Sequence, residues 1–119
     1  MLLAVVHDYA DRLAADGISA EVVDVRSLVP LDVRTILASV AKTGRFVTVE
    51  ENPRLCGWGA EIVSIVSDEA FWDLDGPCLR ITTPHIPLPA AGSLEDLAMP
   101  SAERIHATIA ASMDVRGTA

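Results

Sequence analysis

The sequence predicts a three-layer α/β fold, with a mostly parallel sheet and helices on both faces. Segments of helical periodicity alternate along the chain with short runs rich in valine and isoleucine, a pattern typical of parallel strands joined by crossover helices. Half of the 119 residues are hydrophobic but only 4% are aromatic. The core therefore consists mainly of small and branched aliphatic side chains, which suit helices packed on a parallel sheet.

The first half predicts a helix, a strand and a second helix. The opening helix ends at Gly17, which fits the position after a helix C-terminus. Residues 19–25 are rich in β-branched side chains and predict a buried strand. Asp32 is the expected N-cap of the next helix, which ends near Gly44.

The second half continues the alternation. The expected elements are a strand over 45–50, a helix over 59–71, a strand over 78–82, a short helical turn capped by Ser93 and a last helix capped by Ser101. Pro84, Pro87 and Pro89 force an extended connection between the last strand and the short turn.

The chain opens on a helix, whereas parallel α/β folds usually open on a strand. We therefore expect a first strand to be missing, and a domain over residues 1–113 followed by a disordered tail over 114–119. The missing strand would leave apolar surface bare, so self-association is expected, which light scattering would detect.

Charge and hydropathy limit the classes of partner. A net charge of −8 argues against nucleic acid and favours a basic protein partner. The mean hydropathy of +0.35 indicates apolar surface that a partner covers. No apolar run approaches the ~18 residues of a membrane span, and the N-terminus lacks the basic region of a signal peptide. With Cys56 and Cys78 read as isolated reduced thiols, this predicts a cytoplasmic protein.

The stretch from Arg45 to Ser67 is the most distinctive one. Gly57 and Gly59 bracket a tryptophan just before an apolar helix, which allows an anion-binding or nucleotide-binding site. However, Ile62 stands where the dinucleotide fingerprint has its third glycine, and Glu61 would repel a phosphate. The alternative is that the glycines permit a positive φ and close helix–strand packing.

Glu50 and Glu51 raise the possibility of an acid/base pair. Adjacent strand residues point to opposite faces of a sheet, so both cannot reach one substrate. The structural alternative is a carboxylate paired with Arg54 or Arg80. The three histidines are far apart in sequence and no nucleophile stands in a recognisable motif. We therefore assign no catalytic, cofactor-binding or metal-binding residue.

An acidic run with two aromatic residues follows the central helix. Glu69, Trp72, Asp73 and Asp75 form either an ordinary solvated face or a docking patch for a basic partner.

Several spaced motifs resemble the C-terminal domain of transketolase-like proteins, and most of all the β subunit of the E1 component of 2-oxo acid dehydrogenase complexes. The family pattern D-L-R-[ST]-L-x-P-L-D is matched from Asp24 to Asp32, with Val25 for the first leucine. The pattern E-E-x-P-x-x-G-G-x-G-A-E-I is matched from Glu50 to Ile62, through Pro53 and with Cys56 for the first glycine. The closing L-P-S-x-E-R-I is matched from Met99 to Ile105, with methionine for the leucine.

One loop departs from the family. Its G-x-D-x-P-x-P pattern is matched only by Pro87 and Pro89, with Thr83 for the glycine and His85 for the aspartate. The resemblance covers roughly residues 1–113.

The resemblance implies a role without chemistry for this stretch. In the family, thiamine diphosphate and magnesium lie between other domains, so they are implied for the full complex and not for this fragment, which we expect to be inactive alone. The implied partners are the E1 α subunit, the rest of E1 β and the E2 subunit-binding domain. The 2-oxo acid, branched-chain or pyruvate, stays open. Alternatives are the same domain of a transketolase or a deoxyxylulose-phosphate synthase, or a stand-alone anion-binding module.

Overall fold

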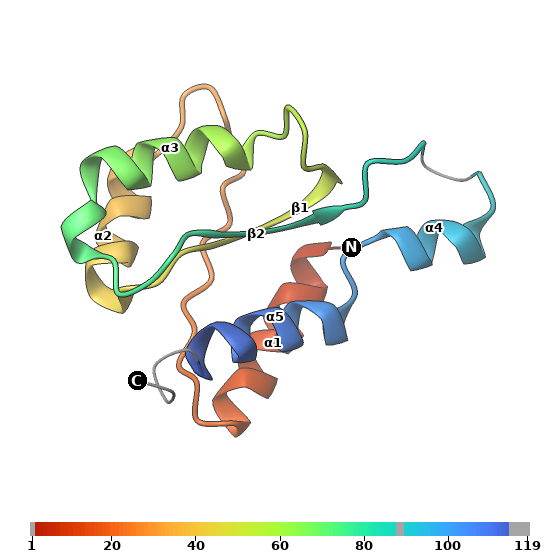
Figure 1. The fold of residues 1–119 in the computed structure, drawn as a ribbon, viewed down its shortest axis with the longest axis horizontal. Coiled ribbons are helices and arrows are strands. Elements are labelled where there is room, and N and C mark those ends of the chain that lie inside the picture. Colours follow the sequence, from red (N-terminus) through yellow and green to blue (C-terminus); the bar gives the residue numbers. More distant parts are fainter. Residues whose placement is uncertain (1, 88–89, 115–119) are drawn as a thin grey trace.

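The computed structural model describes residues 2–87 and 90–114, with side chains over 9–87, 90–94 and 97–113. The elements in chain order are α1 (Leu2–Ala15), α2 (Val33–Thr43), β1 (Val47–Pro53), α3 (Gly59–Glu69), the short 3₁₀ helix η1 (Phe71–Asp73), β2 (Leu79–Thr83), α4 (Gly92–Ala98) and α5 (Ala102–Asp114). Figure 1 shows α2 and α3 on one side of the strands, and α1 and α5 on the other. The predicted three-layer arrangement is therefore confirmed.

The sheet that the structure describes has two parallel strands, β1 and β2. Val47 pairs with Leu79 and Val49 with Ile81, and an irregularity follows before Pro53 pairs with Thr83. Successive residues point to opposite faces, so β1 offers two different surfaces to the two helical layers.

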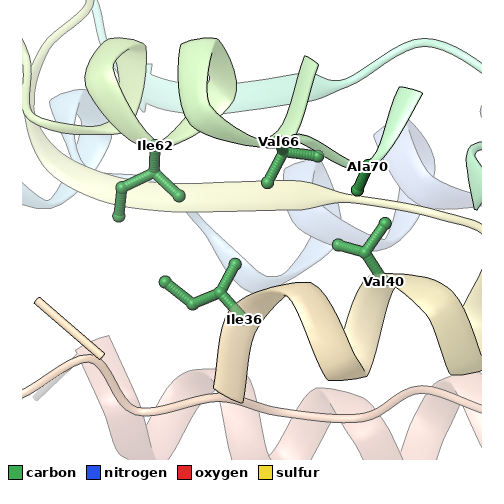
Figure 2. Close-up of a cluster of buried hydrophobic side chains, with 5 residues drawn as sticks. All are labelled: Ile36, Val40, Ile62, Val66 and Ala70. Atoms are coloured by element: carbon green, nitrogen blue, oxygen red, sulfur yellow. The ribbon is translucent and has the colours of Figure 1, made fainter. Parts of the chain in front are cut away.

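The layer of α2 and α3 has its own aliphatic core. Ile36 and Val40 of α2 point toward Ile62 and Val66 of α3 and toward Ala70, as Figure 2 shows. All five side chains are buried. Helical spacing on both helices produces this contact, because residues three or four apart share a helix face.

A second cluster of buried side chains lies between the sheet and the layer of α1 and α5. Tyr9 of α1 and Ile105 of α5 bury against Ile81 of β2, and Val47 and Val49 of β1 pack beside them. The aliphatic face of the sheet therefore looks toward α1 and α5.

Local signals correctly predicted the end of α1, both ends of α2 and the start of α5. The side chain of Asp32 accepts a hydrogen bond from the backbone N–H of Thr35 at 3.1 Å, and Ser101 caps α5 through the N–H of Arg104 at 3.2 Å. Gly17 and Gly44 have φ of 80° and 68°, which a side chain disfavours. The N–H of Gly44 also closes α2 on the carbonyl of Val40.

Three expectations were wrong in detail. Residues 19–25 form no strand, although Val23 and Val25 do pack against the α2–α3 core. The helix predicted over 59–71 ends at Glu69, and η1 follows it. Ser93 lies inside α4, which begins at Gly92, so it is not a cap. β-Branched residues favour a strand only where a neighbouring edge is in reach, which explains the first miss.

Residues 115–119 of the predicted tail lie outside the described residues, and Asp114 is the last residue of α5. Leu88 and Pro89 of the proline-rich connection also lie outside them. Within the described residues, no helix is both long enough and apolar enough to cross a membrane. Self-association stays a prediction.

Candidate functional site

A buried carboxylate occupies the centre of the strand–turn–helix stretch. Thr48 and Glu50 point from β1 toward α3, because they alternate along the strand with two valines, Val47 and Val49, that face the other layer. The side chain of Glu50 is completely buried, and so is most of Arg80, whose side chain is 9% exposed. The side of the sheet that faces α3 therefore carries an ion pair where an aliphatic contact would be usual.

Five hydrogen bonds reach the Glu50 carboxylate. Oε1 accepts from Thr48 Oγ1 at 3.0 Å and from Arg80 Nε at 3.0 Å. Oε2 accepts from Asn52 Nδ2 at 3.0 Å, from the backbone N–H of Gly59 at 3.0 Å and from Arg80 Nη2 at 3.2 Å. The fork of Arg80 thus binds both oxygens, which is the strong bidentate arrangement.

The pKa of Glu50 reflects two opposing effects. Burial of the carboxyl is the largest one and by itself raises the pKa, because it disfavours the charged form. The hydrogen bonds from Arg80, Asn52, Gly59 and Thr48 together outweigh burial, so the pKa lies below the usual value of 4.5. Glu50 is therefore an ionised structural anion rather than a proton donor near neutral pH.

Close packing accounts for the two glycines that flank Trp58. A Cβ added to Gly59 would lie 2.5 Å from Cδ of Glu50 and 2.8 Å from Oγ1 of Thr48. A Cβ added to Gly57 would lie 2.6 Å from Nη2 of Arg80. Neither glycine has a positive φ. The packing alternative is confirmed, but its conformational part was wrong at these positions.

The anion-binding alternative does not fit this geometry. The amide of Gly59 at the start of α3 already donates to Glu50, so the chain supplies its own anion. Glu61 is exposed in the first turn of α3, and Glu51 is exposed on the other side of β1 from Glu50. Pro53 is half-buried at the end of β1. A diphosphate would meet these charges, so the residues present do not fit thiamine diphosphate.

The acid/base pair is likewise excluded by position. Glu50 is enclosed and Glu51 is exposed, as the alternation along a strand requires. Of the two arginines predicted as partners, Arg80 pairs with Glu50, while Arg54 lies exposed in the turn after β1. Asn52 and Thr48 were not expected in the network. The signal for Thr48 was its spacing two residues before Glu50, which places both on one face.

Cys56 has a left-handed backbone, with φ of 57°. It is exposed in the turn between β1 and α3 and stands where the family pattern has a glycine. A side chain in this conformation costs roughly 1–2 kcal/mol. The turn of this chain therefore carries strain at that position.

The acidic aromatic run lies at the far end of α3. Trp72 is 93% exposed, and its ring meets Phe71 edge-on with centroids 5.0 Å apart. Glu69 and Asp73 are exposed beside them. The backbone N–H of Asp75 donates to the carbonyl of Gly44 at 2.7 Å, which fixes the loop after η1 onto the end of α2. We call Glu69, Phe71, Trp72, Asp73 and Asp75 the acidic aromatic patch.

No group of metal-ligating side chains converges within the described residues. His85 is exposed in the proline-rich connection, and His106 of α5 lies 2.5 Å from the carboxylate of Asp16. We call the strand–turn–helix stretch over residues 47–69 the rim. It contains a buried ion pair between Glu50 and Arg80 of β2, and the acidic aromatic patch is exposed at the C-terminal end of its helix.

Comparison with known proteins agrees with this picture. Residues 1–105 match the family model of the transketolase C-terminal domain. The chain belongs to this family.

Curated relatives include β subunits of the pyruvate dehydrogenase E1 component. One from Arabidopsis thaliana is 51% identical over 96 residues, covering 81% of this chain and 26% of the relative. One from Rickettsia bellii is 48% identical over 94 residues, covering 79% and 29%. The chain thus spans little more than a quarter of the length of these relatives.

A solved structure shows the same fold. The inactive beta4 tetramer of a split-gene transketolase superposes with a TM-score of 0.72 at 26% identity, covering 92% of this chain and 35% of the other. The α/β fold with parallel strands and helical layers is therefore that of the family.

The first prediction concerns the buried ion pair. Arg80→Ala would leave the Glu50 charge without its bidentate partner, and we expect a loss of about 3–5 kcal/mol in the free energy of unfolding at pH 7. Urea denaturation measures it. Arg54→Ala, at an exposed arginine of the same stretch, serves as the matched control and should change stability by less than about 0.5 kcal/mol.

The pH dependence gives an independent readout of the same pair. The pKa of Glu50 is lowered by folding, so its stabilisation is present above its unfolded value of 4.5 and is lost as pH falls through the folded value. The difference between wild type and Arg80→Ala should therefore narrow below pH 4.5. Equal losses in both arginine variants at pH 7 would contradict the assignment.

The second prediction concerns the strained turn. Cys56→Gly should raise the free energy of unfolding by about 0.5–1 kcal/mol, because relief of the left-handed backbone exceeds the added entropy of the unfolded chain. Thermal and urea unfolding measure the change. Cys56→Ser keeps a side chain at the same φ and should leave stability unchanged. A glycine variant no more stable than the serine variant would show that the turn is unstrained.

Proposed function

We propose that this chain is the C-terminal domain of the β subunit of a pyruvate dehydrogenase E1 component, and that it serves assembly and docking. The observation that carries the proposal is that about half of the aligned residues of this domain are identical to those of proteins of that name. The geometry supports a role in assembly rather than in catalysis. The buried carboxylate of Glu50 receives its hydrogen bonds from groups of this domain and so is engaged within it.

The reaction proposed for the whole protein is the oxidative decarboxylation of a 2-oxo acid. Pyruvate is favoured over a branched-chain acid, because the similar relatives carry the pyruvate name. Thiamine diphosphate and magnesium would bind in other domains of the assembled protein. We also propose that the protein is located in the cytoplasm.

The proposed partners are the E1 α subunit, the rest of the β subunit and the subunit-binding domain of E2. The acidic aromatic patch is the best candidate for the E2 contact. Exposed tryptophan is enriched among residues that carry binding energy, and the surrounding carboxylates would attract a basic domain. The net charge of −8 has the matching sign.

Two other functions have less support. The same domain of a transketolase would share the fold, but the similarity there is 26%. The stand-alone anion-binding module is disfavoured because Glu50 accepts from the amide of Gly59 at the start of α3.

The third prediction is that the isolated chain does not bind thiamine diphosphate. The α3 N-terminus is already used by Glu50 and the neighbouring acids would repel a diphosphate. Titration calorimetry with thiamine diphosphate and Mg²⁺ should give no saturable heat, with complete E1 as the positive control. Binding with micromolar affinity would overturn the proposed role in assembly rather than in catalysis.

The fourth prediction tests docking. In E1 assembled with its α subunit, Trp72→Ala should weaken binding of the E2 subunit-binding domain by about 2 kcal/mol, roughly thirtyfold, as expected of an exposed aromatic anchor. Val29→Ala is the matched control, since Val29 is 92% exposed but lies outside the patch. Surface plasmon resonance measures both.

Charge reversal tests the electrostatic contribution of the acidic aromatic patch to binding of the E2 domain. Glu69→Lys should slow association, and the effect should shrink as salt rises. Glu103→Lys, an exposed acid on α5, should have little effect. Unchanged affinity in both Trp72→Ala and Glu69→Lys at low salt would remove the patch from the interface.

A further inference from the structure

The loop between η1 and β2 carries one end of the acidic aromatic patch, and the segment that precedes β1 holds this loop in place. The backbone N–H of Asp75 donates to the carbonyl of Gly44 at 2.7 Å. The N–H of Leu79 donates to the carbonyl of Phe46 at 3.0 Å. Arg45 stands between the two acceptors in sequence. The position of Asp75 in the patch therefore depends on the chain around Arg45.

The guanidinium of Arg45 lies against the main chain of the same loop. A Cβ added to Gly76 would overlap Nη1 of Arg45 and would lie 3.0 Å from its Cζ. Gly76 has no positive φ. The missing side chain at this position therefore serves the close approach of the guanidinium and not an unusual backbone.

The same guanidinium reaches the other helical layer. Arg45 Nη1 donates to the backbone carbonyl of Ser112 at 3.2 Å, in a half-buried position. Ser112 lies in the last turn of α5, where carbonyls lack partners within the helix and the helix dipole favours a cation. Figure 1 shows α5 across the strands from α2 and α3, so Arg45 joins the patch loop to the opposite layer.

The patch needs this support because its main aromatic side chain is not held by a core. Trp72 is 93% exposed, and the aromatic ring that it contacts, Phe71, is 57% exposed. Groups that are fixed before a partner arrives bind more tightly, since ordering them on binding lowers the affinity. The position of the patch therefore follows from how firmly its loop is attached to the domain.

We propose that Arg45 is a positioning residue for the acidic aromatic patch. By covering Gly76 and binding the end of α5, it fixes the loop that carries Asp75 in the orientation that a partner meets. Arg45 acts through the loop and not by contact with the partner. The inference rests on the proposed function, because the position of the patch matters only if the patch docks a partner.

The experiment uses E1 assembled with its α subunit and compares Arg45→Ala with Gly76→Ala. The first variant removes the guanidinium, and the second keeps it but displaces it, because the added methyl group takes its place. Hydrogen exchange in peptides that span residues 74–79 should become about tenfold faster in both variants. Dissociation of the E2 subunit-binding domain should become about fivefold faster, because changes within one interface act mainly on the dissociation rate.

Three comparisons separate positioning from a general loss of structure. A variant with both substitutions should dissociate no faster than either single one, because both act on one contact. Arg45→Lys keeps a cation for the Ser112 carbonyl and should hold the dissociation rate within about twofold of wild type. Arg104→Ala, at an exposed arginine of α5, should change neither exchange at 74–79 nor dissociation.

The outcomes distinguish this proposal from the proposed function. Unchanged exchange at 74–79 in Arg45→Ala would overturn the positioning role whatever the partner does. Faster exchange with an unchanged dissociation rate would also overturn it, if Trp72→Ala still weakens binding. Unchanged binding in both Trp72→Ala and Arg45→Ala would overturn docking at the patch, and the positioning role with it.

Discussion

The structure of the rim depends on one buried charge. A carboxylate that is removed from water is tolerated only if it is paired and fully hydrogen-bonded. Glu50 meets this condition with groups from three elements: Thr48 and Asn52 of its own strand, Gly59 at the start of α3 and Arg80 of strand β2. Any shift of one segment relative to the others would leave the charge unsatisfied, so the ion pair holds strand, turn and helix in one arrangement.

This constraint explains why small residues stand around it. Gly57 and Gly59 approach the carboxylate and the guanidinium so closely that a single methyl group would overlap them. The same closeness places the first amide of α3 on Glu50, where a helix N-terminus would otherwise attract an external anion. The buried charges of Glu50 and Arg80 thus neutralise each other, whereas the acids Glu51 and Glu61 are exposed to solvent.

The sequence predicted what local chemistry decides. The caps at Asp32 and Ser101 follow from side chains that reach nearby amides, and the separation of Glu50 from Glu51 follows from strand alternation. What it missed depends on distant partners. The valines of residues 19–25 are only half-buried, and their backbone lacks a neighbouring strand and so forms no strand. The choice of Arg80 over Arg54 was equally open until the register of β1 and β2 was known.

The glycine pattern shows why a motif must be read with the charges that surround it. Two glycines before a helix suit either an external phosphate or an internal carboxylate, since both need close approach to main-chain amides. The deciding feature is an acid within the preceding strand whose side chain points toward the helix. Glu50 has this position, and an arginine on the adjacent strand neutralises it. A strand that carries such an acid therefore argues for an internal anion, and the functional surface must be sought elsewhere on the domain.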